Sequence, residues 1–148
     1  MGKQNAYISQ KGPKKDDKWI YVDFCLGKEV VPLGTHTSLI YWDETRKNRI
    51  ILQFIADGLQ KGEQVVCITD SLTKETILDW IKEKKIPIPE ADIEKKLVVQ
   101  TPESMYYPNG YFSPEETMEK WRRFLTENPA EGLRITGEIN WLSSGLPG

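Results

Sequence analysis

The sequence predicts a three-layer α/β sandwich with a mostly parallel central sheet. From residue 37 onward, short apolar runs alternate with amphipathic segments of helical length, and strands separated by such helices pair in parallel through right-handed crossovers. The run at residues 64–69 is apolar nearly throughout, as expected of a strand that is covered on both faces. With 148 residues, of which 39% are hydrophobic, the chain buries one ordinary core. We therefore expect a single domain over residues 19–148.

The N-terminal region predicts a flexible segment followed by one strand. Residues 1–18 are polar, rich in lysine and interrupted by Gly12 and Pro13, a composition typical of mobile chain ends. Residues 19–24 have the aromatic and β-branched content of a short strand, and Gly27 marks its end.

The first strand–helix–strand unit spans residues 37–69. Residues 37–41 are predicted to form a first buried strand, and a helix is predicted over residues 46–61. The helix has an apolar stripe made of Ile50, Ile51, Phe54, Ile55 and Leu59. Gly62 is placed to end it in a left-handed turn, before the second strand at residues 64–69.

The same alternation continues to the third strand. Asp70 or Ser71 can cap a helix that runs to about residue 84. The apolar stripe of this helix consists of Leu72, Ile77, Leu78 and Ile81. A short helical turn at residues 91–96 then leads to the strand at residues 97–100.

An aromatic loop at residues 102–112 precedes the clearest helix start in the chain. Ser113, Pro114 and Glu116 combine an N-cap serine, a proline at the first helical position and a glutamate at the third, which is a capping box. Met118, Trp121 and Leu125 are predicted to form the buried face of this helix. A fourth strand is predicted at residues 133–139.

The turn after the first predicted strand has no phosphate-binding loop. A glycine-rich loop ending in Gly-Lys-Ser/Thr would be needed there, whereas residues 41–47 read YWDETRK and contain no glycine. Bulky rings and two carboxylates occupy the place where backbone amides would have to approach a phosphate. A binding domain is therefore expected rather than a nucleotidase.

Ligands of open α/β sheets bind beyond the carboxyl ends of the strands. In this chain, the predicted strand ends carry aromatic rings and a few hydrogen-bond acceptors. The side chains at the four predicted strand ends include Tyr41, Trp42, Asp70, Ser71, Tyr106, Tyr107, Glu138 and Trp141. Apolar ring faces with a few polar groups suit a small, partly apolar organic ligand. They suit a triphosphate poorly, because the carboxylates would repel it.

Composition argues against several classes of protein. The net charge of −2 provides no basic field for nucleic acid, and no apolar run has the length of a membrane span or a signal peptide. Cys25 and Cys67 are too few for a secreted disulfide framework, and Cys67 is interpreted as a small buried hydrophobe. No metal motif and no nucleophile–base spacing occurs. We expect a cytoplasmic, non-enzymatic protein without a cofactor or a metal.

Four segments in the same order carry a resemblance to a known family. GTHTSLIYWD, DGLQKGEQVVCIT, YFSPEE and LRITGEINWL together resemble the MEDS domain, the sensory domain named for methanogens, methylotrophs and the dichloromethane-responsive regulator DcmR. The match covers about residues 33–142. That family is a divergent relative of the RecA/KaiC ATPase fold without its phosphate loop.

The resemblance implies a RecA-like P-loop-type topology and a cytoplasmic domain of a signalling or transcription-regulatory system that senses hydrocarbon derivatives. The family positions that carry over are His36, Tyr41, Arg134, Thr136, Gly137 and Glu138. Family members continue with another helix and strand, whereas this chain ends at SSGLPG. The sheet is therefore expected to be truncated at its C-terminal end. The roughly thirty residues before the domain are too few for a helix-turn-helix output domain.

Several roles stay open at this level. His36 is either a hydrogen-bonded structural residue or a ligand contact, and Tyr41 and Trp42 either cover the sheet edge or line the site. Arg134 either forms an ion pair with Glu138 or another acid, or contacts the ligand. The aromatic loop is either a lid or a docking surface.

Three functions follow from these alternatives. The first is a small-molecule sensor that controls a signalling output protein. The second is a degenerate RecA/KaiC-like nucleotide binder. The third is a ligand-free interaction module that recruits a partner or forms a homo-oligomer through the aromatic loop or an uncovered sheet edge.

Overall fold

A computed structural model of the chain describes residues 19–23, 27–127 and 132–138. The chain forms two compact units, Met1–Phe54 and Ile55–Gly148. The predicted flexible segment 1–18, the last part of the predicted fourth strand and Trp141 lie outside the described residues. Within the described ranges, no helix combines the length and the apolar character that crossing a membrane requires.

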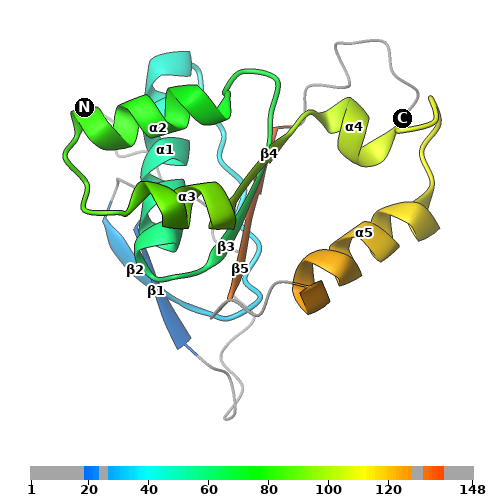
Figure 1. Cartoon of the computed structure of the whole chain (residues 1–148), viewed down its shortest axis with the longest axis horizontal. Coiled ribbons are helices and arrows are strands. Elements are labelled where there is room, and N and C mark those ends of the chain that lie inside the picture. Colours follow the sequence, from blue (N-terminus) through cyan, green and yellow to red (C-terminus); the bar gives the residue numbers. More distant parts are fainter. Residues whose placement is uncertain (1–18, 24–26, 128–131, 139–148) are drawn as a thin grey trace. The chain divides into compact units, whose positions relative to one another are not determined.

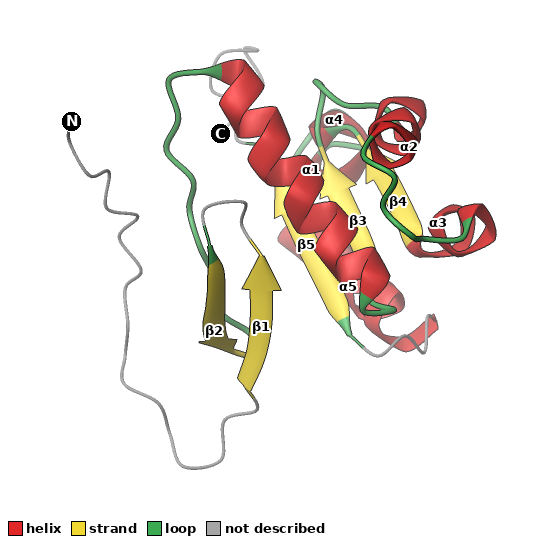
Figure 2. Cartoon of the chain, turned by 90° about the vertical axis from the view of Figure 1, so that its left-hand side faces the viewer, coloured by secondary structure: helices red, strands yellow, loops and turns green. Residues whose placement is uncertain are grey.

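The N-terminal unit contains a β-hairpin made of β1 (Trp19–Asp23) and β2 (Lys28–Pro32) (Figure 2). The predicted strand β1 is confirmed, whereas β2 was not expected. Alternation along the two strands separates a buried set from an exposed set: Val22 and Val31 are buried, while the paired residues Tyr21 and Val30 face solvent. The turn glycine Gly27 has a φ of 143°, which an L side chain rarely adopts.

The prediction of a first buried strand at residues 37–41 is wrong. These residues form no strand, and all five are exposed, with Ile40 retaining 78% of its accessible surface. The pairings of the described strands include no partner for this segment. β-propensity measures how well side chains fit a half-buried pleated surface. A sequence with high β-propensity therefore does not form a strand without a neighbouring strand.

Helix α1 (Glu44–Gln60) matches the predicted helix closely. Of its predicted stripe, Ile50, Ile55 and Leu59 are buried, while Ile51 and Phe54 are half-buried. Gly62 has a φ of 76° and donates its backbone N–H to the Leu59 carbonyl over 3.0 Å. It ends the helix as predicted.

The C-terminal unit is built on a three-stranded parallel sheet in the order β4-β3-β5. The strands are β3 (Gln64–Ile68), β4 (Leu97–Gln100) and β5 (Leu133–Gly137). The central strand β3 is buried at every position, which confirms the expectation from its apolar sequence. The helices are α2 (Lys74–Glu83), α3 (Glu90–Lys96), α4 (Pro102–Tyr106) and α5 (Pro114–Glu127).

Helices lie on both faces of this sheet. Figure 1 shows α2 and α3 on one side of the strands and α5 on the other. On the α5 side, Val66 and Ile68 of β3 pack with Met105 of α4, and Trp121 and Phe124 of α5 complete this cluster. The unit is therefore an α/β fold with a parallel sheet between two layers of helices, as the sequence predicts.

Two local predictions in this unit are corrected. Helix α2 is capped by Thr73, whose side chain accepts a hydrogen bond from the Thr76 N–H, and not by Asp70 or Ser71. The first half of the aromatic loop is helix α4, which Thr101 caps in the same way. Thr101 and Thr73 each lie one residue before a helix and have a hydroxyl that reaches the N–H three positions on.

The buried face of α5 differs in part from the prediction. Met118 and Leu125 are exposed, whereas Thr117 is buried and Phe124 packs with Trp121 against the sheet. Residues 117, 121 and 124 follow the same helical spacing as the predicted stripe but are rotated by part of a turn. The two largest rings fill the space over β3, and this orientation leaves Met118 and Leu125 on a flank of the helix.

Candidate functional site

The carboxyl ends of β3 and β5 meet at one point. Gly137 lies opposite Ile68 in the parallel register, and the Glu138 N–H donates to the Ile68 carbonyl over 3.0 Å. The Thr69 N–H donates to the Gln100 carbonyl at the end of β4 over 2.8 Å. These bonds bring the residues that follow β3 and β5 together at the edge where an α/β sheet binds its ligands.

A chain of hydroxyl groups leads to a buried carboxylate at this edge. The Thr69 hydroxyl accepts from the Ser71 N–H over 3.0 Å and lies 3.1 Å from the Ser71 hydroxyl. The Ser71 hydroxyl in turn donates to Oε1 of Glu138 over 2.8 Å. Glu138 is only 7% exposed and Thr69 is buried, whereas Ser71 faces solvent. Ser71 thus connects a surface position with the buried acid.

The corrected cap of α2 explains why Ser71 is available for this contact. Because Thr73 caps the helix, the Ser71 hydroxyl is not needed for the free N–H groups of its first turn. Asp70 is exposed beside it. A carboxylate as buried as Glu138 is uncommon in proteins unless it is paired or hydrogen-bonded.

Cys67 lies in β3 close to this carboxylate and is almost fully buried. Burial raises the pKa of its thiol from an ordinary value of 9.0 to about 12, and the negative charge of Glu138 adds to the rise. A thiol with so high a pKa stays protonated at neutral pH, whereas nucleophilic and metal-binding cysteines act as thiolates. The structure thus agrees with the interpretation of Cys67 as a small buried hydrophobe.

Arg134 lies on β5 opposite Val65, four residues before Glu138. Its guanidinium contacts Glu63 through Nε at 2.6 Å and Nη2 at 3.0 Å, and contacts Asp57 through Nη1 at 2.7 Å. All three side chains are largely buried. Arg134 therefore forms ion pairs with other acids, one of the alternatives that the sequence left open, and its role as a ligand contact stays a prediction.

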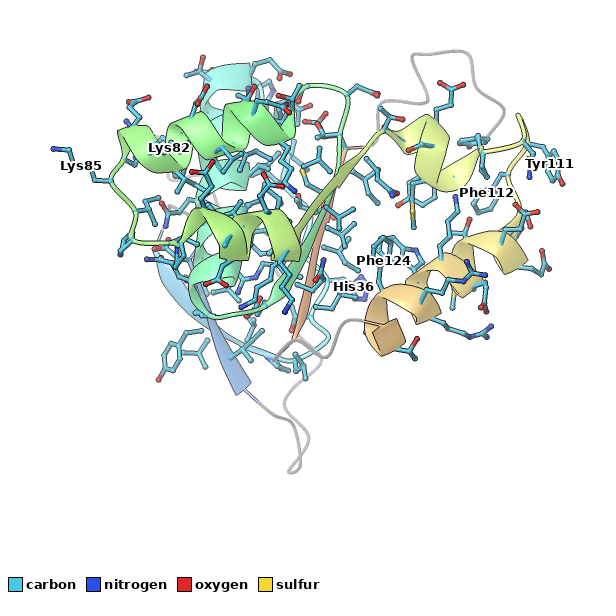
Figure 3. All side chains as sticks on the ribbon, in the orientation of Figure 1. His36, Lys82, Lys85, Tyr111, Phe112 and Phe124 are labelled. Atoms are coloured by element: carbon cyan, nitrogen blue, oxygen red, sulfur yellow. The ribbon has the colours of Figure 1, made fainter. Side chains whose placement is uncertain are left out.

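The predicted aromatic site residues differ in exposure. Tyr107 is buried and its ring packs against Phe112 with centroids 6.0 Å apart, while Tyr106 is half-buried and burial raises the pKa of its hydroxyl. Tyr111 and Phe112 extend from the loop before α5, where Figure 3 shows Tyr111 pointing outward. Gly110, with a φ of 79°, makes the turn between the inward and outward rings.

The remaining predicted site residues belong to the N-terminal unit. His36, Tyr41 and Trp42 are all exposed, Trp42 to 80%. The Lys47 ammonium lies 5.0 Å from the centre of the Tyr41 ring, within the range of a cation–π contact.

Asp43 caps α1 in the same unit. Its Oδ1 accepts from the N–H groups of Thr45 at 2.8 Å and Arg46 at 3.2 Å. Helix N-termini bind phosphates through such N–H groups, and here a carboxylate of the chain itself uses two of them.

The sequence did not indicate Thr69 as a site residue, and it indicated Ser71 both as a strand-end residue and as a candidate helix cap. Their position directly after an apolar strand was the available signal. The hydrogen bond of Ser71 to Glu138 could not be inferred from this position, because the two residues are 67 positions apart. Within the described residues, no three His, Cys, Asp or Glu side chains come together as a metal site.

The fold and the site place this chain among the α/β proteins that gather polar groups where parallel strands end. The family model of the MEDS domain, described as the methanogen/methylotroph, DcmR sensory domain, matches residues 35–148. The chain therefore belongs to the MEDS family of sensory domains. No curated protein and no solved structure matches it.

Proposed function

We propose that this sensory domain binds a small, partly apolar organic molecule beyond the carboxyl ends of β3 and β5, with Glu138 as its polar anchor. The observation that carries the proposal is the hydrogen bond from the solvent-facing Ser71 to the buried carboxylate of Glu138. Buried charge is costly and adds little stability of its own. A ligand-binding role gives a reason for keeping a carboxylate at this buried position.

The residues at this edge favour a particular kind of ligand. Glu138 and the exposed Asp70 are both acidic, so a hydroxyl, amide or amine head group is favoured over a phosphate or a carboxylate. Ser71 can either donate or accept, and a ligand that replaces its bond to Glu138 would change the position of the loop before α2. Such a change is a physical route from ligand binding to the rest of the unit.

Binding without catalysis is part of the proposal. Burial raises the pKa of the Cys67 thiol near this carboxylate and keeps it protonated, and the Ser71 hydroxyl is hydrogen-bonded to Glu138. A degenerate nucleotide site is less favoured, because Asp43 already accepts hydrogen bonds from the first turn of α1. The domain would act by binding its ligand, and a signalling partner would recognise the resulting change in the loop before α2.

Thermal unfolding with a panel of small alcohols, amines, amides and halogenated hydrocarbons tests the proposal, with calorimetry for any compound that raises the melting temperature. A ligand at 100 times its Kd stabilises the fold by about 2.7 kcal/mol. Glu138→Gln keeps the size of the side chain and removes its charge, so it should weaken binding at least tenfold. The matched control Glu115→Gln, on the exposed first turn of α5, should bind like the wild type.

Two results would count against the proposal. Equal affinity of wild type and Glu138→Gln for a panel ligand would place the site elsewhere. Saturable binding of ATP, with no response to any uncharged compound, would favour the nucleotide-binding alternative.

A further inference from the structure

Strand β5 turns polar residues toward its buried face. Because side chains alternate along a strand, Arg134, Thr136 and Glu138 share one face and Ile135 lies on the other. Arg134 and Glu138 are buried, whereas Ile135 is 44% exposed. This is the reverse of the usual arrangement, in which the apolar residues of a strand are covered and the polar ones face water. Each polar residue on the buried face therefore needs a physical reason.

The structure gives that reason for two of the three residues. Arg134 is held by two carboxylates, and Glu138 accepts a hydrogen bond from Ser71. Thr136 differs from both, because it is half-buried and its hydroxyl has no hydrogen-bond partner in the described part of the chain. A hydroxyl taken from water without a partner costs free energy. The Thr136 hydroxyl thus adds nothing to the stability of the fold.

Thr136 lies beside the carboxylate of the proposed site. The Glu138 N–H donates to the Ile68 carbonyl, so the pairing of β5 with β3 continues through position 138. Thr136 lies opposite Cys67 in this register, which puts these two side chains on one face of the sheet. Burial, and after it the negative charge of Glu138, raises the pKa of the Cys67 thiol, in agreement with a carboxylate on that same face.

We infer that the Thr136 hydroxyl is a second polar contact for the ligand of Glu138, and that this ligand carries two polar groups on neighbouring carbons. The inference rests on the proposed function. An ionised carboxylate only accepts hydrogen bonds, so the group bound to Glu138 is a hydroxyl or an amine, while a threonine hydroxyl can donate or accept. The ligand class is therefore a short aliphatic 1,2-diol or 1,2-amino alcohol.

The spacing along β5 favours two polar groups over one. Alternate residues of a parallel strand are about 6.6 Å apart along the chain. One polar atom with a hydrogen bond of about 2.8 Å on each side spans at most about 5.6 Å. Two polar atoms on neighbouring carbons span the longer distance. A compound with a single polar group would bind to Glu138 and leave Thr136 without a partner.

The test compares compounds that differ only in the second polar group, namely 1,2-hexanediol with 1-hexanol, and 1-amino-2-hexanol with hexylamine. Titration calorimetry on the full chain should show at least tenfold tighter binding of each bifunctional compound. Thr136→Val keeps the β-branched shape and removes the hydroxyl, so it should abolish this preference while changing the affinity for 1-hexanol by less than twofold. Thr136→Ser keeps the hydroxyl and should retain the preference.

The ligand-free chain shows whether Thr136 has a structural role instead. Because its hydroxyl has no partner in the described residues, Thr136→Val should leave the melting temperature and the circular dichroism spectrum unchanged. The matched control is Thr126→Val, on an exposed position of α5, which should keep the preference for the bifunctional compounds. A clear loss of stability in Thr136→Val would show that the hydroxyl supports the fold and would overturn the inference.

The binding results separate this inference from the proposed function. Binding that depends on Glu138 but shows no preference for two polar groups, or a preference that survives in Thr136→Val, would overturn the inference alone. The same holds if none of the four compounds binds while another small molecule binds through Glu138. If no compound binds through Glu138, both the inference and the proposed function fail.

Discussion

Arg134 and Glu63 form a two-point ion pair across 71 positions of the sequence, with Nε to Oε2 at 2.6 Å and Nη2 to Oε1 at 3.0 Å. Asp57 of α1 contacts the same guanidinium, and Lys61 contacts Asp57 at 2.7 Å. The cluster thus joins the end of α1, the start of β3 and strand β5. Planar two-point recognition of a carboxylate is a property of arginine that lysine lacks.

Arg134→Ala should lower the free energy of unfolding by about 3–5 kcal/mol, because it leaves two largely buried carboxylates without their shared cation. Arg134→Lys should lose less, since an ammonium keeps the charge but not the two-point geometry. Urea unfolding followed by circular dichroism measures both. The exposed Arg123→Ala serves as the control and should change stability by no more than about 0.5 kcal/mol. A stable Arg134→Ala variant would show that the cluster contributes little.

Gly58 in α1 should not tolerate even a methyl group. A Cβ at this position would lie 2.8 Å from Cδ and Nε of Arg134 and 3.0 Å from Val65. Alanine is a better helix former by about 1 kcal/mol, but the guanidinium cannot move aside without breaking its ion pairs. Gly58→Ala should therefore destabilise the protein by about 1–3 kcal/mol. Gln60→Ala, exposed in the last turn of the same helix, is the matched control, and a more stable Gly58→Ala would contradict this account of the packing.

The cap of α2 can be tested by comparing two neighbouring positions. Thr73→Ala removes the hydroxyl that accepts from the Thr76 N–H and should cost about 1 kcal/mol. Asp70→Ala, at one of the two positions that the sequence indicated for the cap, should change stability by less than half of that. Thermal unfolding of the two variants under the same conditions provides the measurement. The opposite order would restore the sequence-based assignment of the cap.

Sequence patterns predicted most of the C-terminal unit. The continuous apolar run of β3 and the capping box at Ser113 are local signals, and both elements lie where they were expected. The prediction of a strand at residues 37–41 was wrong because a strand needs a neighbouring strand, and the sequence of the segment alone does not specify that pairing. The prediction that Met118 and Leu125 are buried is wrong, because the apolar residues of α5 cover a wider arc of the helix than the face that packs on the sheet.

The candidate site was predicted in outline and not in its contacts. The rule that ligands bind at strand ends correctly indicated Glu138 and the residues after β3 as neighbours. The role of Arg134 depended on Asp57 and Glu63, which lie more than seventy positions away, and no local pattern selects such a partner. Ser71 likewise bonds to Glu138, which lies 67 positions away, so the fold is needed to show this contact.

The buried thiol of Cys67 should make stability fall at alkaline pH. Its pKa rises from 9.0 to about 12 on folding, so the folded state holds a proton that the unfolded state loses above pH 9. The stabilisation is complete below pH 9 and is lost as the pH rises toward 12, at up to about 1.4 kcal/mol per pH unit. Because lysines and tyrosines titrate in the same range, the measured quantity is the difference in unfolding free energy between wild type and Cys67→Ala at each pH.

Loss of the methylene and sulfur contacts lowers the stability of the variant at every pH, so only the slope of this difference is diagnostic. The advantage of wild type should shrink from pH 9 upward, and the native thiol should resist iodoacetamide at pH 8 while the urea-unfolded chain reacts. A pH-independent difference, together with rapid alkylation of native Cys67, would show that the thiol is open to solvent.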